Sequence, residues 1–386
     1  MSNTIINSYN FDVCFIAFNE PLVDARTINI AKLVARKGSK VALIAYGKDE
    51  DIRHYRSYGI DFFPIEKSTQ SKVYVRWSLF KIEAAKLNDK INAKYYYACD
   101  LYSLPVAADM KKAMRLMGAK SKLYYDSREI YSELGPLSGH YFKQAVISKI
   151  EKMYVPAVDR MITSGEMDSE YLKKYFKHEV PYLEILNLPP FQKVPRTELL
   201  RNKAKLEDDV LILVYQGMIL KGRGLKESID AVNKMEKVHL FIIGTGEYYQ
   251  EIANYTIQEG ASKKVTFTGR VPYARLLEIT ASADVGLCLF EPVSLSYEYA
   301  LPNKLFEYIM AGIATLATDL PQIRKIVNKE RIGLLVNHDL NVDDIVEKIE
   351  EMRNLENRKT FIEQALLVSK EYSYESQTEK IMNIFP

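Results

Sequence analysis

The sequence predicts an α/β protein with two doubly wound domains, and three observations support this fold class. The chain has 386 residues, more than the ~250–300 that one hydrophobic core usually holds. Short apolar runs alternate with helix-length segments, a βα pattern typical of parallel sheets. The first series of runs occupies residues 11–18, 40–46, 94–99, 122–126 and 160–164. A second series occupies residues 210–217, 238–244, 265–269, 285–290 and 313–318.

A proline-rich stretch separates the two series. Residues 187–203 contain three prolines and no regular period, as expected of a linker. We therefore place an N-terminal domain at 1–190, a linker at 191–205 and a second domain at 206–370. Ligands of doubly wound domains bind at the carboxyl ends of the strands. We expect a site there, where the two domains face each other.

Composition argues against several classes of protein. A net charge of +3 creates no global field that would favour nucleic acid. The cysteines, Cys14, Cys99 and Cys288, are far apart and form no C-x-x-C pair, which suits a reducing compartment. The N-terminus lacks the basic start and apolar run of a signal peptide, and no window has the ~18 apolar residues of a membrane span. We expect a cytoplasmic protein.

The loop after the run at 210–217 is the first candidate site. Gly217 ends the run, two more glycines and the cations Lys221 and Arg223 follow, and an amphipathic helix opens near Leu225. Backbone amides and basic side chains at a helix start favour anionic oxygens, most often phosphate. The alternative is a flexible loop with solvated cations. The order of a P-loop is absent.

Two further stretches have the residues of a nucleotide site. Gly244 and Gly246 follow a run, but Tyr249 stands where a dinucleotide fingerprint has its third glycine, so a tight turn is favoured over NAD binding. At 302–311 we expect a helix with Pro302 in its first position and Gly312 at its stop. Glu307, on that helix, could accept hydrogen bonds from ribose hydroxyls. Alternatively, it could simply be an acid near the helix N-terminus that the helix dipole favours.

These motifs, in this order, resemble the C-terminal domain of group 1 (family 4-like) glycosyltransferases of the GT-B fold. The resemblance includes V-T-F-T-G-R-V-P at 265–272 and P-N-K-L-F-E-Y-I-M-A-G at 302–312. In the first domain, D-A-R-T (24–27), A-C-D-L-Y-S-L-P (98–105) and Y-D-S-R-E-I-Y (125–131) are similar to stretches of the same family. S-Y-E-S-Q at 373–377 resembles the start of its last helix, so 371–386 should cross back to the first domain.

The resemblance implies two Rossmann-like domains, the first for the acceptor and the second for a nucleotide-sugar donor, around a central cleft. It implies that Gly217 and Arg223 contact the diphosphate, that backbone near Val271 holds the base, and that Glu307 binds ribose. The implied donor-binding residues are Gly217, Met218, Lys221, Arg223, Gly244, Val271, Asn303, Lys304 and Glu307. The implied catalytic residues are Arg223, Glu298 and Glu307. No cofactor or metal is implied, because basic side chains and helix amides neutralise the diphosphate.

The chain also departs from the family pattern. The first acid of the two-glutamate motif falls at Tyr299, with Glu298 one residue away, and Arg128 stands where the family often has His. Asp100, Arg128 and Glu129 are candidates for the acceptor side, with helix capping as the alternative for Asp100 and Glu129.

We therefore expect a glycosyltransferase that moves a sugar from a nucleoside-diphosphate sugar to a cell-surface or lipid-linked glycan, with retention of anomeric configuration. The alternative is a non-catalytic GT-B subunit that binds sugar nucleotides or acts as a scaffold. The basic and apolar segments 111–122 and 141–154 could contact anionic lipid at the inner face of the cell membrane, or they could be solvated helices.

Overall fold

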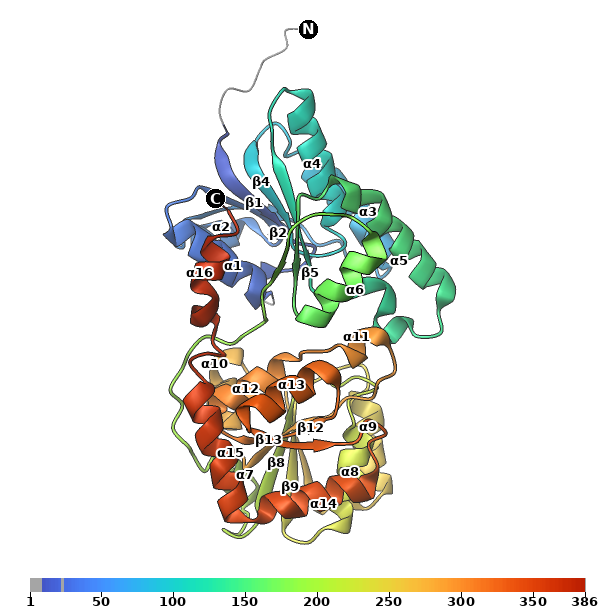
Figure 1. Ribbon diagram of the computed structural model, residues 1–386, viewed down its shortest axis with the longest axis vertical. Coiled ribbons are helices and arrows are strands. Elements are labelled where there is room, and N and C mark those ends of the chain that lie inside the picture. Colours follow the sequence, from blue (N-terminus) through green and yellow to red (C-terminus); the bar gives the residue numbers. More distant parts are fainter. Residues whose placement is uncertain (1–8, 22–23, 386) are drawn as a thin grey trace. The chain divides into compact units, whose positions relative to one another are not determined.

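The computed structural model describes residues 9–21 and 24–385. The first eight residues, on which the expectation of no signal peptide depends, lie outside the described part, as do 22–23 and 386. The chain forms two compact units, unit 1 with residues up to Leu186 and from Gln377 onward, and unit 2 with Asn187–Ser376. Each unit is a parallel sheet with helices, which confirms the predicted fold class (Figure 1).

Unit 1 contains a seven-stranded sheet in the order β3-β2-β1-β4-β5-β6-β7, and every neighbouring pair is parallel. The strands are β1 (Phe11–Ile16), β2 (Val41–Tyr46), β3 (Ile60–Ile65), β4 (Ala93–Ala98), β5 (Lys122–Ser127), β6 (Arg160–Thr163) and β7 (Tyr182–Glu184). The α-helices are α1 (Ala25–Arg36), α2 (Ile52–Arg56), α3 (Val73–Ala85), α4 (Leu104–Leu116), α5 (Tyr141–Tyr154), α6 (Glu166–Phe176) and α16 (Thr378–Met382). Strands such as β2 are buried along their whole length, as is usual when helices cover both faces of a sheet.

The last described residues of the chain pack on the sheet of unit 1. The Phe385 ring stacks on Tyr124 of β5 with 5.6 Å between centroids, and it meets Phe15 of β1 edge-on. Helix α16 lies against α1 on this side (Figure 1). The opposite side of the sheet is covered by α3 and α4, whose apolar residues join one core with alternate residues of the strands.

Unit 2 contains a six-stranded parallel sheet in the order β10-β9-β8-β11-β12-β13. The strands are β8 (Leu211–Gln216), β9 (Val238–Ile243), β10 (Val265–Gly269), β11 (Val285–Cys288), β12 (Ala314–Thr318) and β13 (Gly333–Val336). The α-helices are α7 (Leu199–Ala204), α8 (Leu225–Lys234), α9 (Tyr249–Gln258), α10 (Tyr273–Thr280), α11 (Leu295–Glu298), α12 (Asn303–Ala311), α13 (Pro321–Glu330), α14 (Val342–Arg353) and α15 (Leu355–Val368). The strand order reverses between β8 and β11, so ligands are expected where these two strands end.

Two local predictions for unit 2 differ from the structure. Helix α12 begins at Asn303, and Pro302 is the residue before it, with an extended backbone (φ −75°, ψ 141°) and a carbonyl that accepts from Leu305 N at 3.0 Å. Pro302 therefore caps α12 instead of occupying its first position, whereas Gly312 ends the helix as predicted, with φ +66°. Helix α7 lies inside the stretch expected to be linker.

Within the described ranges, no helix is long and apolar enough to cross a membrane.

Candidate active site

The loop after β8 is held by close backbone packing against the loop after β9. Gly217 N donates to Ile243 O at 3.0 Å, and Ile219 N donates to Thr245 O at 3.0 Å. A Cβ on Gly244 would lie 1.9 Å from Gly217 O. A Cβ on Gly246 would lie 2.1 Å from Ile219 O. Both positions therefore require glycine for this contact, and the tight-turn interpretation accounts for the G-T-G sequence.

Arg223 lies in the same loop and contacts two aromatic rings that meet edge-on. Its guanidinium carbon lies 4.3 Å from the ring centroid of Phe290, just after β11, and 4.6 Å from that of Tyr297 on α11. The flanking glycines have positive φ, +81° at Gly222 and +60° at Gly224, and a Cβ on Gly222 would lie 3.0 Å from the Tyr297 ring. Among the described residues, the buried Arg223 Nε has no hydrogen-bond partner.

A second cation, Lys304, approaches from the first turn of α12. Its side chain is buried, with Nζ 3.7 Å from the ring centroid of Tyr215 and 5.3 Å from that of Phe290. In the described part of the chain, this ammonium also has no hydrogen-bond partner. Burial lowers the pKa of Lys304 to about 7, and the charge of Arg223 contributes to the shift.

The two cations thus share the Phe290 ring at the point where β8 and β11 end. A buried cationic donor without an acceptor is unfavourable unless a ligand supplies one. Anionic oxygens would satisfy both the charge and the hydrogen-bonding capacity of Arg223 and Lys304. The arrangement is therefore suited to a ligand with several negatively charged oxygens.

A pocket of about 180 Å³ opens beside the loop, and it is lined by Lys221, Arg223, Lys226, Glu291 and their neighbours, but not by Lys304. A larger pocket of about 440 Å³ lies in unit 1 between α2 and β3. We place the site at the two unpartnered cations because they require a ligand on chemical grounds, whereas the larger hollow has no comparable group.

Glu307 lies one turn beyond Lys304 and is also buried. Its Oε2 accepts from Gln216 Nε2 at 2.5 Å, and Gln216 Oε1 accepts from Thr280 Oγ1 at 2.5 Å. Burial raises the pKa of Glu307, and the hydrogen bond from Gln216 opposes that rise. A buried chain of three side chains therefore fixes the position of the Glu307 carboxylate.

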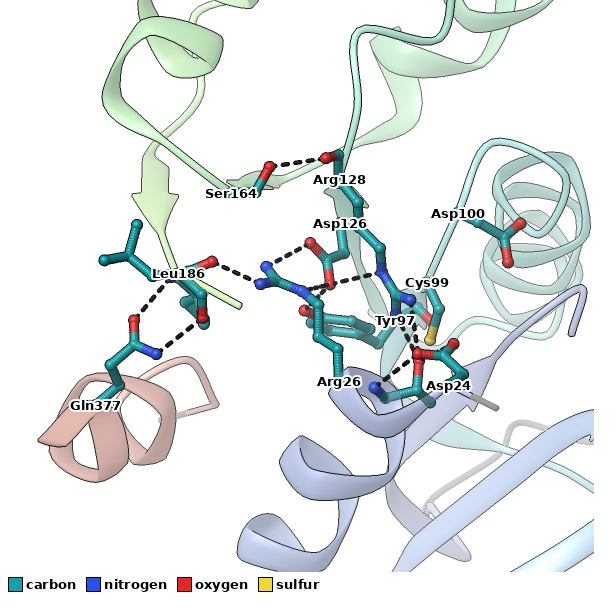
Figure 2. A network of polar contacts seen from close by, with 12 residues as sticks. Asp24, Arg26, Tyr97, Cys99, Asp100, Asp126, Arg128, Ser164, Leu186 and Gln377 are labelled. Atoms are coloured by element: carbon teal, nitrogen blue, oxygen red, sulfur yellow. Dashed lines mark hydrogen bonds and ion pairs between the residues drawn. The ribbon is translucent and has the colours of Figure 1, made fainter. Parts of the chain in front are cut away.

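In unit 1, Arg128 belongs to a network of buried charges (Figure 2). Its Nη1 donates to Asp24 Oδ1 at 2.7 Å and its Nη2 donates to Thr27 Oγ1 at 2.5 Å. Arg26 makes two 2.8 Å bonds to Asp126, which also accepts from Arg128 Nε at 3.4 Å. Burial acts to raise the pKa of Asp24, but Arg128 and the hydrogen bonds from Thr27 together hold that pKa below its usual value. The guanidinium of Arg128 is thus engaged within unit 1.

Asp100 and Glu129 lie in different surroundings. Asp100 Oδ1 accepts from Ser103 N at 2.7 Å ahead of α4, and its Oδ2 accepts from Phe18 N at 2.8 Å. The N-cap of α4 is Ser103, whose side chain makes no capping hydrogen bond, and Asp100 instead joins the turn before α4 to the loop after β1. Glu129 is exposed.

Comparison with protein families identifies unit 2. Residues 196–367 match the family described as "Glycosyl transferases group 1". They form a group 1 glycosyl transferase domain. The chain therefore contains a glycosyltransferase domain, which agrees with the predicted enzyme class. No curated protein sequence matches it.

Solved structures share the fold of the whole chain at low sequence identity. Sucrose-phosphate synthase from Thermosynechococcus elongatus has a TM-score of 0.81 and 13% identity, over 97% of this chain and 98% of that one. HepE of Anabaena, in complex with UDP and glucose, has a TM-score of 0.74 and 12% identity, over 97% and 99%. WaaG, a glycosyltransferase involved in lipopolysaccharide biosynthesis, has a TM-score of 0.67 and 15% identity, over 97% and 99%. These similarities confirm the predicted GT-B fold.

The glycosyl transferase domain gathers only some of the predicted donor residues. Gly217 lies beside Lys304, whose Cε would be 3.8 Å from a Cβ at that glycine. Exposed side chains belong to Met218, Lys221, Asn303 and Glu298. Val271 is half-buried in the loop between β10 and α10, and Tyr299 is half-buried directly after α11. Glu298, at the end of α11, is therefore more exposed than the half-buried Arg223 and the buried Lys304 and Glu307.

The sequence did not predict the roles of Gln216 and Thr280. Gln216 is fully buried, and it is the one polar residue in the run L-I-L-V-Y-Q of β8. A polar residue at the carboxyl end of an otherwise apolar strand was the one indication in the sequence that Gln216 has a buried hydrogen-bond partner. Its partner could not be identified, because Glu307 is far away in the sequence.

The network around Arg128 leads to a test of its role. An Arg128→Met variant is expected to lower the free energy of unfolding by about 2 kcal/mol, since Asp24 keeps its bonds from Thr27 but loses its cation. Urea denaturation measures the change. Arg115→Met, on the exposed surface of α4, is the control and should change stability by less than about 0.5 kcal/mol. Unchanged stability of Arg128→Met would show that its ion pairs are not structural.

Proposed function

We propose that the protein transfers a sugar from a nucleoside-diphosphate sugar to a glycan acceptor, and that unit 2 binds the donor. The observation that carries the proposal is the pair of buried, unpartnered cationic donors, Arg223 Nε and Lys304 Nζ, within the described residues of unit 2. A diphosphate offers negative charge and several acceptor oxygens in one ligand. The fold shared with HepE, whose structure holds UDP and glucose, supports the same class of donor.

We propose further contacts to the ribose, the base, the phosphate and the sugar of the donor. Glu307, held by Gln216, would accept hydrogen bonds from the ribose hydroxyls. Backbone around Val271 would meet the base, and Asn303, as the first residue of α12, would present free helix amides to phosphate. Glu298 or Tyr299 would contact hydroxyls of the donor sugar.

The chemistry required of the site is stabilisation of a leaving group. As the glycosidic bond breaks, negative charge develops on the β-phosphate and an oxocarbenium-like centre forms at the anomeric carbon. Arg223, fixed on two rings, and Lys304 would stabilise the developing charge by preorganised electrostatics. The acceptor hydroxyl would attack the anomeric carbon on the same face from which the leaving group departs. It would pass its proton to the β-phosphate, and the anomeric configuration would be retained. We propose that no metal takes part, because these cations supply the charge.

The acceptor is proposed to be a cell-surface or lipid-linked glycan, used on the cytoplasmic side of the cell membrane. The similarity in fold to WaaG, a glycosyltransferase involved in lipopolysaccharide biosynthesis, supports this class of acceptor.

A donor panel tests the proposal. The purified chain is mixed with UDP-, GDP- and dTDP-sugars, and thermal shift, slow donor hydrolysis and transfer to candidate glycans are measured. We expect a shift and hydrolysis with the donors of one nucleotide. A shift without hydrolysis or transfer would favour a non-catalytic, sugar-nucleotide-binding subunit. If no donor produced a thermal shift, both the transferase and the sugar-nucleotide-binding subunit would be contradicted.

Gln216 provides a test of the ribose contact. A Gln216→Leu variant should bind the donor about tenfold more weakly, because the Glu307 carboxylate loses its hydrogen bond. Without that bond the pKa of Glu307 rises further, so the loss of affinity on acidification should begin at a higher pH than in the wild type. Donor titrations across pH measure both effects. Thr280→Ser keeps the hydroxyl and should behave as the wild type, and an unshifted pH profile of Gln216→Leu would exclude this positioning role.

A further inference from the structure

A group of aromatic side chains lies at the carboxyl ends of the strands of unit 1. The strand order of this sheet reverses between β1 and β4, and ligands of doubly wound domains bind at such a reversal. Phe18 follows β1, Tyr46 ends β2 and Tyr102 follows β4. The ring centroid of Phe18 lies 5.1 Å from that of Tyr46 and 4.9 Å from that of Tyr102. The strands on both sides of the reversal therefore contribute to one aromatic group.

Helix α3 adds Arg76 and Trp77 to this group. The backbone oxygen of Arg76 accepts from Tyr46 OH at 3.3 Å, and Trp77 Nε1 donates to Tyr102 O at 2.7 Å. The Trp77 ring also meets the Tyr102 ring edge-on, with 6.0 Å between centroids. Trp77 and Tyr102 are only half-buried, so a ligand can reach their rings from solvent.

The guanidinium of Arg76 lacks a hydrogen-bond acceptor at this place. Its Nε is buried, and within residues 9–21 and 24–385 it has no hydrogen-bond partner. Burial raises the pKa of Tyr46 to about 12 and also raises the pKa of Tyr102, and in both cases the charge of Arg76 opposes the rise. The guanidinium therefore lies near both tyrosines. A buried cationic donor in this state is unfavourable unless a ligand supplies the acceptor.

Asp100 is a carboxylate that acts on the same two tyrosines, and it raises the pKa of each after burial. Its own hydrogen bonds go to the backbone. Asp100 Oδ1 accepts from Ser103 N at 2.7 Å, and its Oδ2 accepts from Phe18 N at 2.8 Å. In the part of the chain that the structure describes, Asp100 therefore leaves Arg76 Nε without an acceptor.

We propose that Arg76 binds an anionic group, a carboxylate or a phosphate, on the sugar that accepts the transferred residue. A guanidinium suits both anions, because it can donate two parallel hydrogen bonds to either. The rings of Trp77 and Tyr102 would contact the apolar faces of the sugar, since small-ligand sites combine aromatic walls with a few polar groups that fix orientation. This acceptor class rests on the proposed sugar transfer and narrows the glycan acceptor to an acidic one.

Trp77 allows binding at this place to be measured by itself. It is the one tryptophan of the chain, so its fluorescence reports on the surroundings of Arg76 and not on unit 2. The full chain is titrated with glucuronate, with glucose 6-phosphate and, as the neutral match, with glucose. We expect at least one of the anionic sugars to bind about tenfold or more tightly than glucose, because a charge-assisted hydrogen bond is gained. The preferred anion shows whether the group is a carboxylate or a phosphate.

An Arg76→Gln variant should lose this preference, because glutamine keeps a polar side chain but removes the charge. Arg53→Gln, which changes an exposed arginine of α2, is the matched control and should keep the preference. The unfolding temperature of Arg76→Gln should equal or exceed that of the wild type, because Arg76 Nε has no partner to lose among the described residues. A lower unfolding temperature would assign Arg76 to the fold and overturn the proposal.

Three further results would overturn it. They are equal affinities of the wild type for all three sugars, an unchanged preference in Arg76→Gln, and a response to inorganic phosphate as strong as that to glucose 6-phosphate, since the sugar would then add nothing. Thermal shift with UDP is recorded for every variant. Failure of donor binding in unit 2 is thereby seen separately from failure of sugar binding at Arg76.

Discussion

Sugar transfer by an Arg223→Ala variant is expected to be about 100-fold slower than by the wild type, or slower still. The guanidinium contacts the rings of Phe290 and Tyr297, so it needs no reorganisation as charge develops on the leaving diphosphate. Its buried Nε has no other partner among the described residues, so the ligand would gain the full hydrogen bond. Steady-state transfer at saturating donor measures the effect on kcat.

Two companion variants make this result specific. Arg223→Lys keeps the charge but loses the flat guanidinium that contacts both rings, so an intermediate rate is expected. Arg53→Ala removes an exposed arginine of α2 and should have the wild-type rate. Wild-type transfer by Arg223→Ala would refute its role in stabilising the leaving group. If Arg223→Ala and Arg53→Ala lost thermal stability equally, a folding defect would explain the slower transfer instead.

The sequence predicted the sheets more completely than the site. The alternation of apolar runs with helical segments repeats in both halves, and each of the buried runs at 40–46, 210–217 and 238–244 became a strand. Glycines also marked the ends of elements, because a positive φ, as at Gly217 and Gly312, depends on the residue type at that one position. Signals of this kind are local, and a sequence contains them directly.

Contacts between distant residues could not be predicted in the same way. Arg223 and Lys304 were each identified from a motif, but their sharing of the Phe290 ring depends on how β8, β11 and α12 come together. Arg128 was assigned to the acceptor side because it stands where the family often has His. Its ion pair with Asp24 links two segments far apart in the sequence. Likewise, the pattern of α5 did not reveal that Glu151 points inward and the lysines outward.

Replacing Lys304 with methionine is expected to weaken donor binding by about 100-fold at neutral pH, because the diphosphate loses a buried cation. Methionine preserves the bulk that contacts Tyr215 and removes only the charge. Isothermal titration with the donor identified by the panel measures the affinity. Lys263→Met, at an exposed position of unit 2, should bind as the wild type. Equal affinities for wild type and Lys304→Met would remove this residue from the donor site.

The same lysine predicts how donor affinity depends on pH. In the free protein the pKa of Lys304 is lowered to about 7, first by burial and then by Arg223, while Cys288 and Glu307 act weakly in the opposite direction. A bound diphosphate favours the charged ammonium, so the pKa of Lys304 rises in the complex and binding takes up a proton above pH 7. The part of the affinity that depends on Lys304 should therefore be constant below about pH 7 and fall by up to about tenfold per pH unit above about pH 7. Lys304→Met should lose this dependence and the proton uptake together, because methionine does not titrate. A wild-type affinity that stays constant from about pH 6 to about pH 8 would mean that the Lys304 ammonium does not meet the diphosphate.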